Sequence, residues 1–170
     1  QLDEIINQAS LLLLEFPKSP TLYNIIGSSK KGLGKLEEAI EAYKKVLSFN
    51  PNLAEPFNNM GNALQDQGKL EDALKAYAKA ISIKPEYSEA YNNMGNALKN
   101  QGKLEEALGA YTKAIALRPD HANSYYNMGN ALQDQGKLEE AIEAYTKAIT
   151  LKPDYSKAYN NMGIILQDQG

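Results

Sequence analysis

Apolar and polar positions alternate with a helical period along almost the whole chain. Within residues 54–87, apolar or small residues recur at i, i+3, i+4 and i+7, which places them on one face of a helix. The first series is Phe57, Met60, Gly61 and Leu64, and the second is Leu70, Ala73, Leu74, Tyr77, Ala80 and Ile81. The pattern predicts two antiparallel helices, each roughly 20 Å long at the rise of an α-helix.

The ends of these two helices are marked by residues that stop or cap a helix. Gly68 follows the first series, where a cap glycine ends a helix, and Pro85 prevents continuation of the second. Glu71 and Asp72 fall in the first turn of the second helix, and Lys84 falls near its end. These charges suit the helix dipole at each terminus, so the segment is predicted to form a helix–turn–helix unit.

The same unit recurs every 34 residues. Two sets of residues keep this spacing: Pro17, Pro51, Pro85, Pro119 and Pro153, and Gly27, Gly61, Gly95, Gly129 and Gly163. A glycine inside a helix costs about 1 kcal/mol relative to alanine, so its recurrence predicts a close helix–helix contact. One helix pair cannot bury its apolar face alone, and the expected solution is an all-α stack of copies.

The residues at fixed places in each unit resemble the tetratricopeptide repeat. In residues 88–121 the carriers of this resemblance are Tyr91, Gly95, Ala107, Tyr111, Ala114 and Pro119. The resemblance covers almost all of the chain. It implies a right-handed α-solenoid of stacked antiparallel helix pairs, a superhelix whose first helices line an inner groove.

The repeat divides the chain into four complete units with a partial unit at each end. Residues 1–19 are expected to be a second helix only, and residues 156–170 a first helix only. The complete units are 20–53, 54–87, 88–121 and 122–155, all in one solenoid domain. Because both ends fall inside a unit, we expect a segment of a longer protein or its ordered part.

Polar residues occupy the places that the resemblance assigns to the groove. An asparagine amide both donates and accepts hydrogen bonds, so a column of them can hold the backbone of an extended peptide. This is similar to the groove of the O-linked N-acetylglucosamine transferase repeats. The alternative is a solvated polar surface that binds nothing. The candidate residues are Asn58, Asn59, Asn62, Asn92, Asn93, Asn96, Lys99, Tyr126, Asn127, Asn130 and Asn161.

A second mode of binding in the family is not expected. The clamp that holds the terminal carboxylate of chaperones needs lysine and arginine at the groove positions. Here only Lys31, Lys99 and Lys157 bring positive charge to these places. Recognition of chaperone C-termini is therefore not predicted.

Composition excludes several other functions. The net charge of −3 with evenly spread signs argues against nucleic acid and against an acidic membrane surface. The sequence holds no cysteine, which fits a reducing, cytoplasmic compartment, and its longest apolar run, Leu11–Leu14, is too short to span a membrane. No phosphate loop, metal cluster or nucleophile motif is present, so we expect no cofactor, no metal and no catalysis.

Isolated titratable residues have structural explanations. The single histidine, His121, is expected in a solvated turn. Glutamate pairs recur at the starts of second helices, where they complement the dipole. The tyrosines fall at packing places, so a core role is expected for them. The glutamate pairs are Glu37–Glu38, Glu105–Glu106 and Glu139–Glu140, and the tyrosines are Tyr23, Tyr43, Tyr77, Tyr91, Tyr111, Tyr125, Tyr145 and Tyr159.

Three functions remain open from the sequence. The first is a non-catalytic scaffold that binds a protein or an extended peptide in the asparagine-lined groove. The second is the substrate-recognition arm of a larger transferase whose catalytic domain lies outside this chain. The third is end-to-end self-association through the C-terminal helix, because Ile164 and Ile165 stand where earlier units carry asparagine and alanine.

Overall fold

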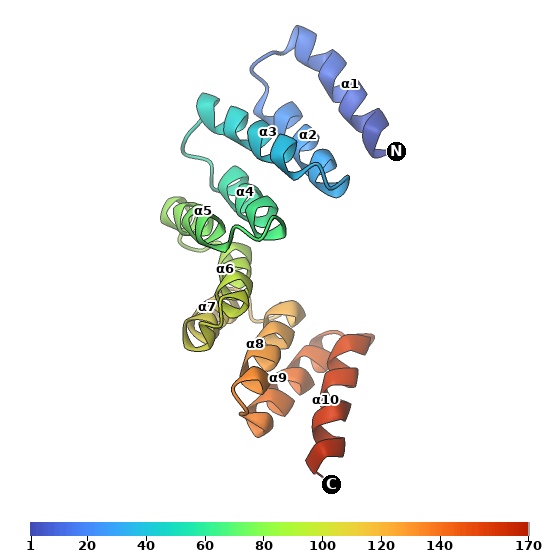
Figure 1. The fold of residues 1–170 in the computed structure, drawn as a ribbon, viewed down its shortest axis with the longest axis vertical. Helices are drawn as coiled ribbons and strands as arrows, with labels where there is room; N and C mark the ends of the chain where they lie inside the picture. Colours follow the sequence, from blue (N-terminus) through green and yellow to red (C-terminus); the bar gives the residue numbers. More distant parts are fainter. Residues whose placement is uncertain (170) are drawn as a thin grey trace. The chain divides into compact units, whose positions relative to one another are not determined.

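The computed structural model describes residues 1–169, and every regular element within them is an α-helix (Figure 1). The chain divides into two compact units, Gln1–Pro85 and Glu86–Gly170, and each of these larger units spans more than one 34-residue repeat. The first holds α1 (Leu2–Glu15), α2 (Pro20–Gly32), α3 (Leu36–Phe49), α4 (Ala54–Asp66) and α5 (Leu70–Ile83). The second holds α6 (Ser88–Asn100), α7 (Leu104–Leu117), α8 (Ala122–Asp134), α9 (Leu138–Leu151) and α10 (Ser156–Gln169). The predicted all-α fold is confirmed.

Within each unit, a helix packs mainly on its neighbours in the sequence. The closest pairs are α2 with α3 and α4 with α5 in the first unit, and α6 with α7 and α8 with α9 in the second. In the described part of the chain no helix is long and apolar enough to cross a membrane. The division into repeats and their union in a single solenoid stay predictions.

A glycine with a left-handed backbone joins the two helices of each complete pair. Gly68 has φ of 76°, its N–H donates to the carbonyl of Gln65 at 2.9 Å, and the N–H of Lys69 donates to the carbonyl of Leu64 at 2.9 Å. These two bonds form the Schellman motif, which satisfies carbonyls at the end of a helix. Gly34, Gly102 and Gly136 have the same conformation, so the predicted cap glycines are confirmed.

The close helix–helix contact predicted at the mid-helix glycines is a contact with a tyrosine. A Cβ atom added to Gly61 would lie 2.5 Å from Cε1 of Tyr77, which is fully buried. The other three pairs are Gly27 with Tyr43, Gly95 with Tyr111, and Gly129 with Tyr145. On α4, Met60 packs on the cluster that contains Ile40 and Tyr43. The aromatic core role is confirmed for these second-helix tyrosines, whereas Tyr159 on α10 is 48% exposed.

Burial controls the ionisation of the same tyrosines. Loss of solvation raises the pKa of Tyr145 to about 12. Burial, assisted by the carboxylates of Asp66 and Asp134, raises the pKa values of Tyr77 and Tyr111 above the ordinary tyrosine range. These phenols are therefore protonated at neutral pH and act as hydrogen-bond donors.

Two mid-helix glycines in the second unit are expected to respond to alanine in opposite ways. Gly95→Ala forces a methyl group against the ring of Tyr111 and should lower the free energy of unfolding by roughly 1–3 kcal/mol. Gly109→Ala on α7 meets no atom within 4 Å and should raise it by roughly 0.5–1 kcal/mol through helix propensity. Urea unfolding of both variants measures the difference, and equal shifts would refute the tyrosine–glycine contact.

Alkaline pH is expected to destabilise the fold through the buried tyrosines. Below about pH 10 the phenols are protonated in both the folded and the unfolded chain. Between about pH 10 and about pH 12 the unfolded chain loses protons that the folded chain keeps at Tyr145, so the free energy of unfolding falls as pH rises. Urea unfolding across this range checks the slope. Tyr145→Phe should make the slope shallower, with the remainder due to Tyr77 and Tyr111, and a slope unchanged by this variant would contradict the assignment.

Candidate functional site

In the second unit, α6 and α8 are the first helices of two successive helix pairs. Hydrogen bonds between them hold some of their polar side chains in place. Asn92 Oδ1 accepts from Ser124 Oγ and from Asn127 Nδ2, both at 3.1 Å. Lys99 Nζ lies 3.3 Å from a carboxylate oxygen of Asp134. Asn92 and Ser124 are buried, so these bonds replace the water that each group would otherwise bind. They fix the position of α6 relative to α8.

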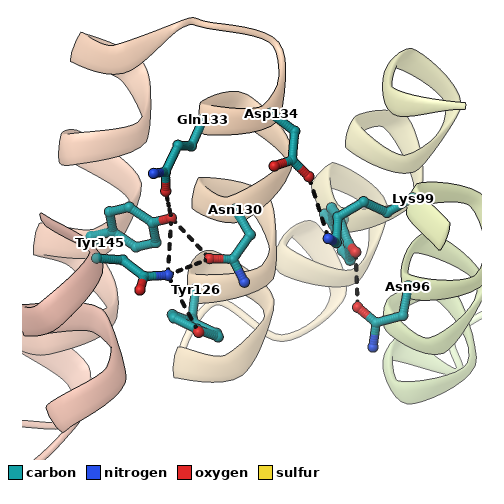
Figure 2. A network of polar contacts seen from close by, with 9 residues as sticks. Asn96, Lys99, Tyr126, Asn130, Gln133, Asp134 and Tyr145 are labelled. Carbon is teal, nitrogen blue, oxygen red and sulfur yellow. Dashed lines mark hydrogen bonds and ion pairs between the residues drawn. The ribbon is translucent and has the colours of Figure 1, made fainter. Parts of the chain in front are cut away.

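The lysines expected in the groove are largely neutralised. Lys31 on α2 lies 2.9 Å from Asp66 on α4. Lys99 on α6 repeats this pairing with Asp134 on α8, two 34-residue repeats further along the chain (Figure 2). Each pair joins neighbouring first helices. The structure therefore offers neither of these two lysines as an unpaired cation for a carboxylate ligand. Lys157 lies exposed on α10.

A second-helix tyrosine binds an asparagine of the first helix in three of the helix pairs. Tyr77 Oη donates to Asn62 Oδ1, Tyr111 Oη to Asn96 Oδ1 and Tyr145 Oη to Asn130 Oδ1, each at 2.8 Å. In the α2–α3 pair, Ser28 takes the place of the asparagine, and its Oγ lies 3.3 Å from Tyr43 Oη. The hydroxyl of a core tyrosine thus reaches the polar surface of the first helix.

Asn161 on α10 completes a larger network on α8. Its Nδ2 donates to Asn130 Oδ1 at 2.9 Å and lies 3.4 Å from Tyr126 Oη. Figure 2 labels Tyr126, Asn130, Gln133 and Tyr145 of this network. Tyr145 Oη is also 2.8 Å from Gln133 Oε1. The ring of Tyr126 packs against the ring of Tyr155, with centroids 4.9 Å apart. Tyr126 is thereby placed by ring packing rather than presented freely to solvent.

The predicted groove residues differ in their accessibility. Asn58 is completely buried and Asn92 is 6% exposed, so neither side chain lies on an open surface. The expectation that all of them line an open groove does not fit these two, because their amides pack inside the fold. The remaining candidates are partly exposed: Asn59, Asn62, Asn93, Asn96, Lys99, Tyr126, Asn127, Asn130 and Asn161. Ligand binding by any of them stays a prediction.

His121 is not a freely solvated turn residue. It is half-buried at the N-cap of α8, and its Nδ1 lies 2.7 Å from Ser124 Oγ. Ser124 Oγ donates its hydrogen to Asn92, so it accepts from His121 Nδ1–H. In the neutral imidazole the proton is therefore on Nδ1. Burial, together with the nearby charge of Arg118, lowers the pKa of His121. Ser124 is fully buried and out of reach of a substrate, so this contact is structural.

Acidic residues form no chemical site in the part of the chain that the structure describes. The glutamate pairs lie exposed in the first turns of α3, α7 and α9, as the dipole argument expects. Lys30, 2.9 Å from Glu38, holds the pKa of that carboxyl below its usual value. Within residues 1–169, no group of three or more metal-ligating side chains comes together.

An apolar groove that the sequence did not predict lies on the side of the second helices. In the first unit it has a volume of about 530 Å³ and runs between α3 and α5, with Phe57, Met60 and Leu64 of α4 among its lining residues. A smaller groove of about 290 Å³ in the second unit is lined by Tyr125, Met128 and Leu132, among others. The recurrence of methionine at one place in each repeat was the available indication.

Comparisons with known proteins support the repeat assignment. A family model described as "Tetratricopeptide repeat" matches residues 86–154, and a second, described as "TPR repeat", matches residues 27–68 and 61–102. No curated protein matches the sequence at a significant level.

Several solved structures share the fold. The MamA protein is 34% identical, with a TM-score of 0.76 over 89% of this chain and 82% of that chain. YrrB, described as a TPR protein with an unusual peptide-binding site, is 25% identical, with a TM-score of 0.74 over 94% of this chain and 82% of that chain. TTC0263 of Thermus thermophilus, a thermophilic TPR protein, is 20% identical, with a TM-score of 0.82 over 98% and 91% of the two chains, a likeness of fold alone.

The family models, the identity to MamA, and the recurring glycine–tyrosine contact lead to the same assignment. The chain belongs to the tetratricopeptide repeat family.

Proposed function

We propose that the chain is a non-catalytic protein-interaction scaffold that binds an extended peptide across the first helices of its second unit. The observation that carries this proposal is the pair of partly exposed asparagines, Asn96 on α6 and Asn130 on α8. The amide oxygen of each is bound by a core tyrosine, while no described residue accepts from its amide nitrogen. Side-chain amides that are held in position and still have unbonded N–H groups are suited to hydrogen-bond the backbone of a peptide ligand.

Two further observations support binding of a peptide rather than of a charged small molecule. Lys99, the cation nearest to these asparagines along α6, is paired with Asp134, so the surface has no strong anion-binding group there. YrrB, which shares the fold and 25% of the residues, is described as having a peptide-binding site. The hydrogen bonds among α6, α8 and α10 keep the surface rigid, which lowers the entropy lost on binding.

Selection from a displayed peptide library tests the proposal. A peptide selected on the wild-type chain should lose at least tenfold in affinity when Asn96→Ala and Asn130→Ala are combined. The matched control combines Glu105→Ala and Glu139→Ala, two exposed residues in the first turns of α7 and α9. Calorimetry measures affinity and circular dichroism checks helix content. Equal affinity of the asparagine variant and the control would place the site elsewhere.

Self-association is a second candidate function, favoured by exposed apolar side chains on α1 and α10. In α6 and α8, Leu98 and Leu132 are buried, but Leu166 at the same place in α10 is 51% exposed. On α1, Leu12 is 48% exposed, although Val46 at the same place in α3 is fully buried. Thus α1 and α10 each expose a face that, in the helices compared with them, is covered by a neighbouring helix. We propose that α10 of one copy pairs with α1 of another.

Of the two isoleucines that the sequence suggested for this contact, one is not exposed. Ile164 is 46% exposed as expected, but Ile165 is buried in the core beside Ala158. Ile165 faces inward because it lies one residue, and so about 100° around the helix, from Ile164. The exposed surface of α10 is formed instead by Tyr159, Ile164 and Leu166.

Light scattering with concentration tests self-association. The wild-type mass should rise with concentration, and Leu166→Lys should restore the monomer because it places a charge in the contact. Gln167→Lys adds the same charge at an exposed neighbouring position and should leave the mass unchanged. A wild-type chain that stays monomeric at millimolar concentration would exclude the interaction.

A further inference from the structure

We propose that Tyr111 and Tyr145 are positioning residues that turn Asn96 and Asn130 into hydrogen-bond donors, so that this surface recognises the carbonyl oxygens of a peptide backbone and not its N–H groups. The inference rests on the proposed peptide-binding function and specifies its chemistry. It also assigns a role in recognition to two core tyrosines that make no direct contact with a ligand.

The orientation of Asn96 follows from the burial of Tyr111. The phenol is completely buried and protonated, and Asn96 Oδ1, at 2.8 Å, is its acceptor. If the amide of Asn96 rotated by 180°, its N–H₂ group would face the phenol and the phenol proton would have no acceptor. A buried donor without an acceptor is unfavourable, so the amide oxygen points to Tyr111 and the nitrogen points away from it.

Asn130 is restricted further, because two groups donate to the same oxygen. Tyr145 Oη lies 2.8 Å from Asn130 Oδ1, and Asn161 Nδ2 lies 2.9 Å from it. These bonds occupy both lone pairs of the oxygen, which leaves only the amide hydrogens for a ligand. Gln133 Oε1, 2.8 Å from the phenol oxygen, is a second acceptor for the single phenol proton, whereas Asn161 Nδ2 donates to Asn130 Oδ1 whichever acceptor the phenol uses.

The consequence is a pair of aligned donors on neighbouring first helices. An asparagine with a free oxygen can bind both the N–H and the C=O of one peptide bond, as the sequence analysis expected. Asn130 has no free lone pair for the N–H, so it can bind only the C=O. Neither residue carries charge, and Asp134 lies beside Asn130 on the same helix. An uncharged carbonyl oxygen is therefore favoured over a carboxylate as the ligand group.

Exchanging each donor for an acceptor tests the direction of these bonds. Asn96→Asp and Asn130→Asp keep the oxygen that accepts from the tyrosine but remove the amide hydrogens. With the peptide selected on the wild-type chain as probe, each variant should lose at least tenfold in affinity. Asn100→Asp adds the same charge on α6, at the place where α4 and α8 carry Asp66 and Asp134, and should change affinity less than twofold.

A double-mutant cycle tests the role of the tyrosine. Tyr111→Phe keeps the ring over Gly95 but removes the phenol proton, so Asn96 loses its fixed orientation. Affinity should fall about threefold to tenfold in the wild-type background and remain unchanged when Asn96→Asp is already present. A structural role alone would weaken binding equally in both backgrounds, and that result would overturn the assignment of Tyr111 as a positioning residue.

The outcomes separate this inference from the function on which it rests. If the wild-type chain selects no peptide, the proposed function fails and the inference fails with it. If a selected peptide needs the asparagines but binds the aspartate variants as tightly as the wild type, the function stands and the donor assignment is wrong. Tighter binding to the aspartate variants would show that the surface accepts N–H groups.

Discussion

The contact between a second-helix tyrosine and a first-helix glycine determines how each complete helix pair of this protein packs. The ring of Tyr77, Tyr111 or Tyr145 occupies the space where a Cβ atom of Gly61, Gly95 or Gly129 would lie. A larger residue at the glycine would drive the helices apart, and a smaller one at the tyrosine would leave a cavity. Small residues such as Ala141 and Ala148 are fully buried in one cluster with Tyr145 and allow the two helices to approach closely.

The same ring connects the core of the pair to its polar surface. Packing over the glycine places the phenol oxygen 2.8 Å from an asparagine on the first helix, in α4, α6 and α8 alike. The core thereby fixes the orientation of a surface amide without any contact from a loop. Asn161 of the next first helix adds to this network on α8, and Asn127 makes a separate contact with Asn92 on α6. Stability and the geometry of the candidate site therefore share the same residues.

Much of the fold was predictable because each determinant acts within a few residues. The 34-residue period, the cap glycine Gly68 and the helix-stopping Pro85 all follow from local backbone preference and hydrophobic spacing. The candidate site was less predictable. Asn58 and Asn96 have the same residue type and lie on first helices, yet Asn58 is buried and Asn96 is partly exposed. His121 was misplaced because its partner Ser124 is buried against Asn92, which is 32 residues away. Ile165 was misplaced although the 34-residue period puts it at the place of Ala131, which is also buried.

The sequence by itself determined the helices, their turns and the family to which the chain belongs, because periodicity and cap chemistry are local and are repeated several times. Only the tertiary structure decided which amides face outward and which of their atoms remain available. That choice depends on a phenol 15 residues away and on an asparagine 31 residues away, at Tyr145 and Asn161 for Asn130. A hydrogen bond has a direction, and its donor and acceptor are identified only when both partners are placed in space.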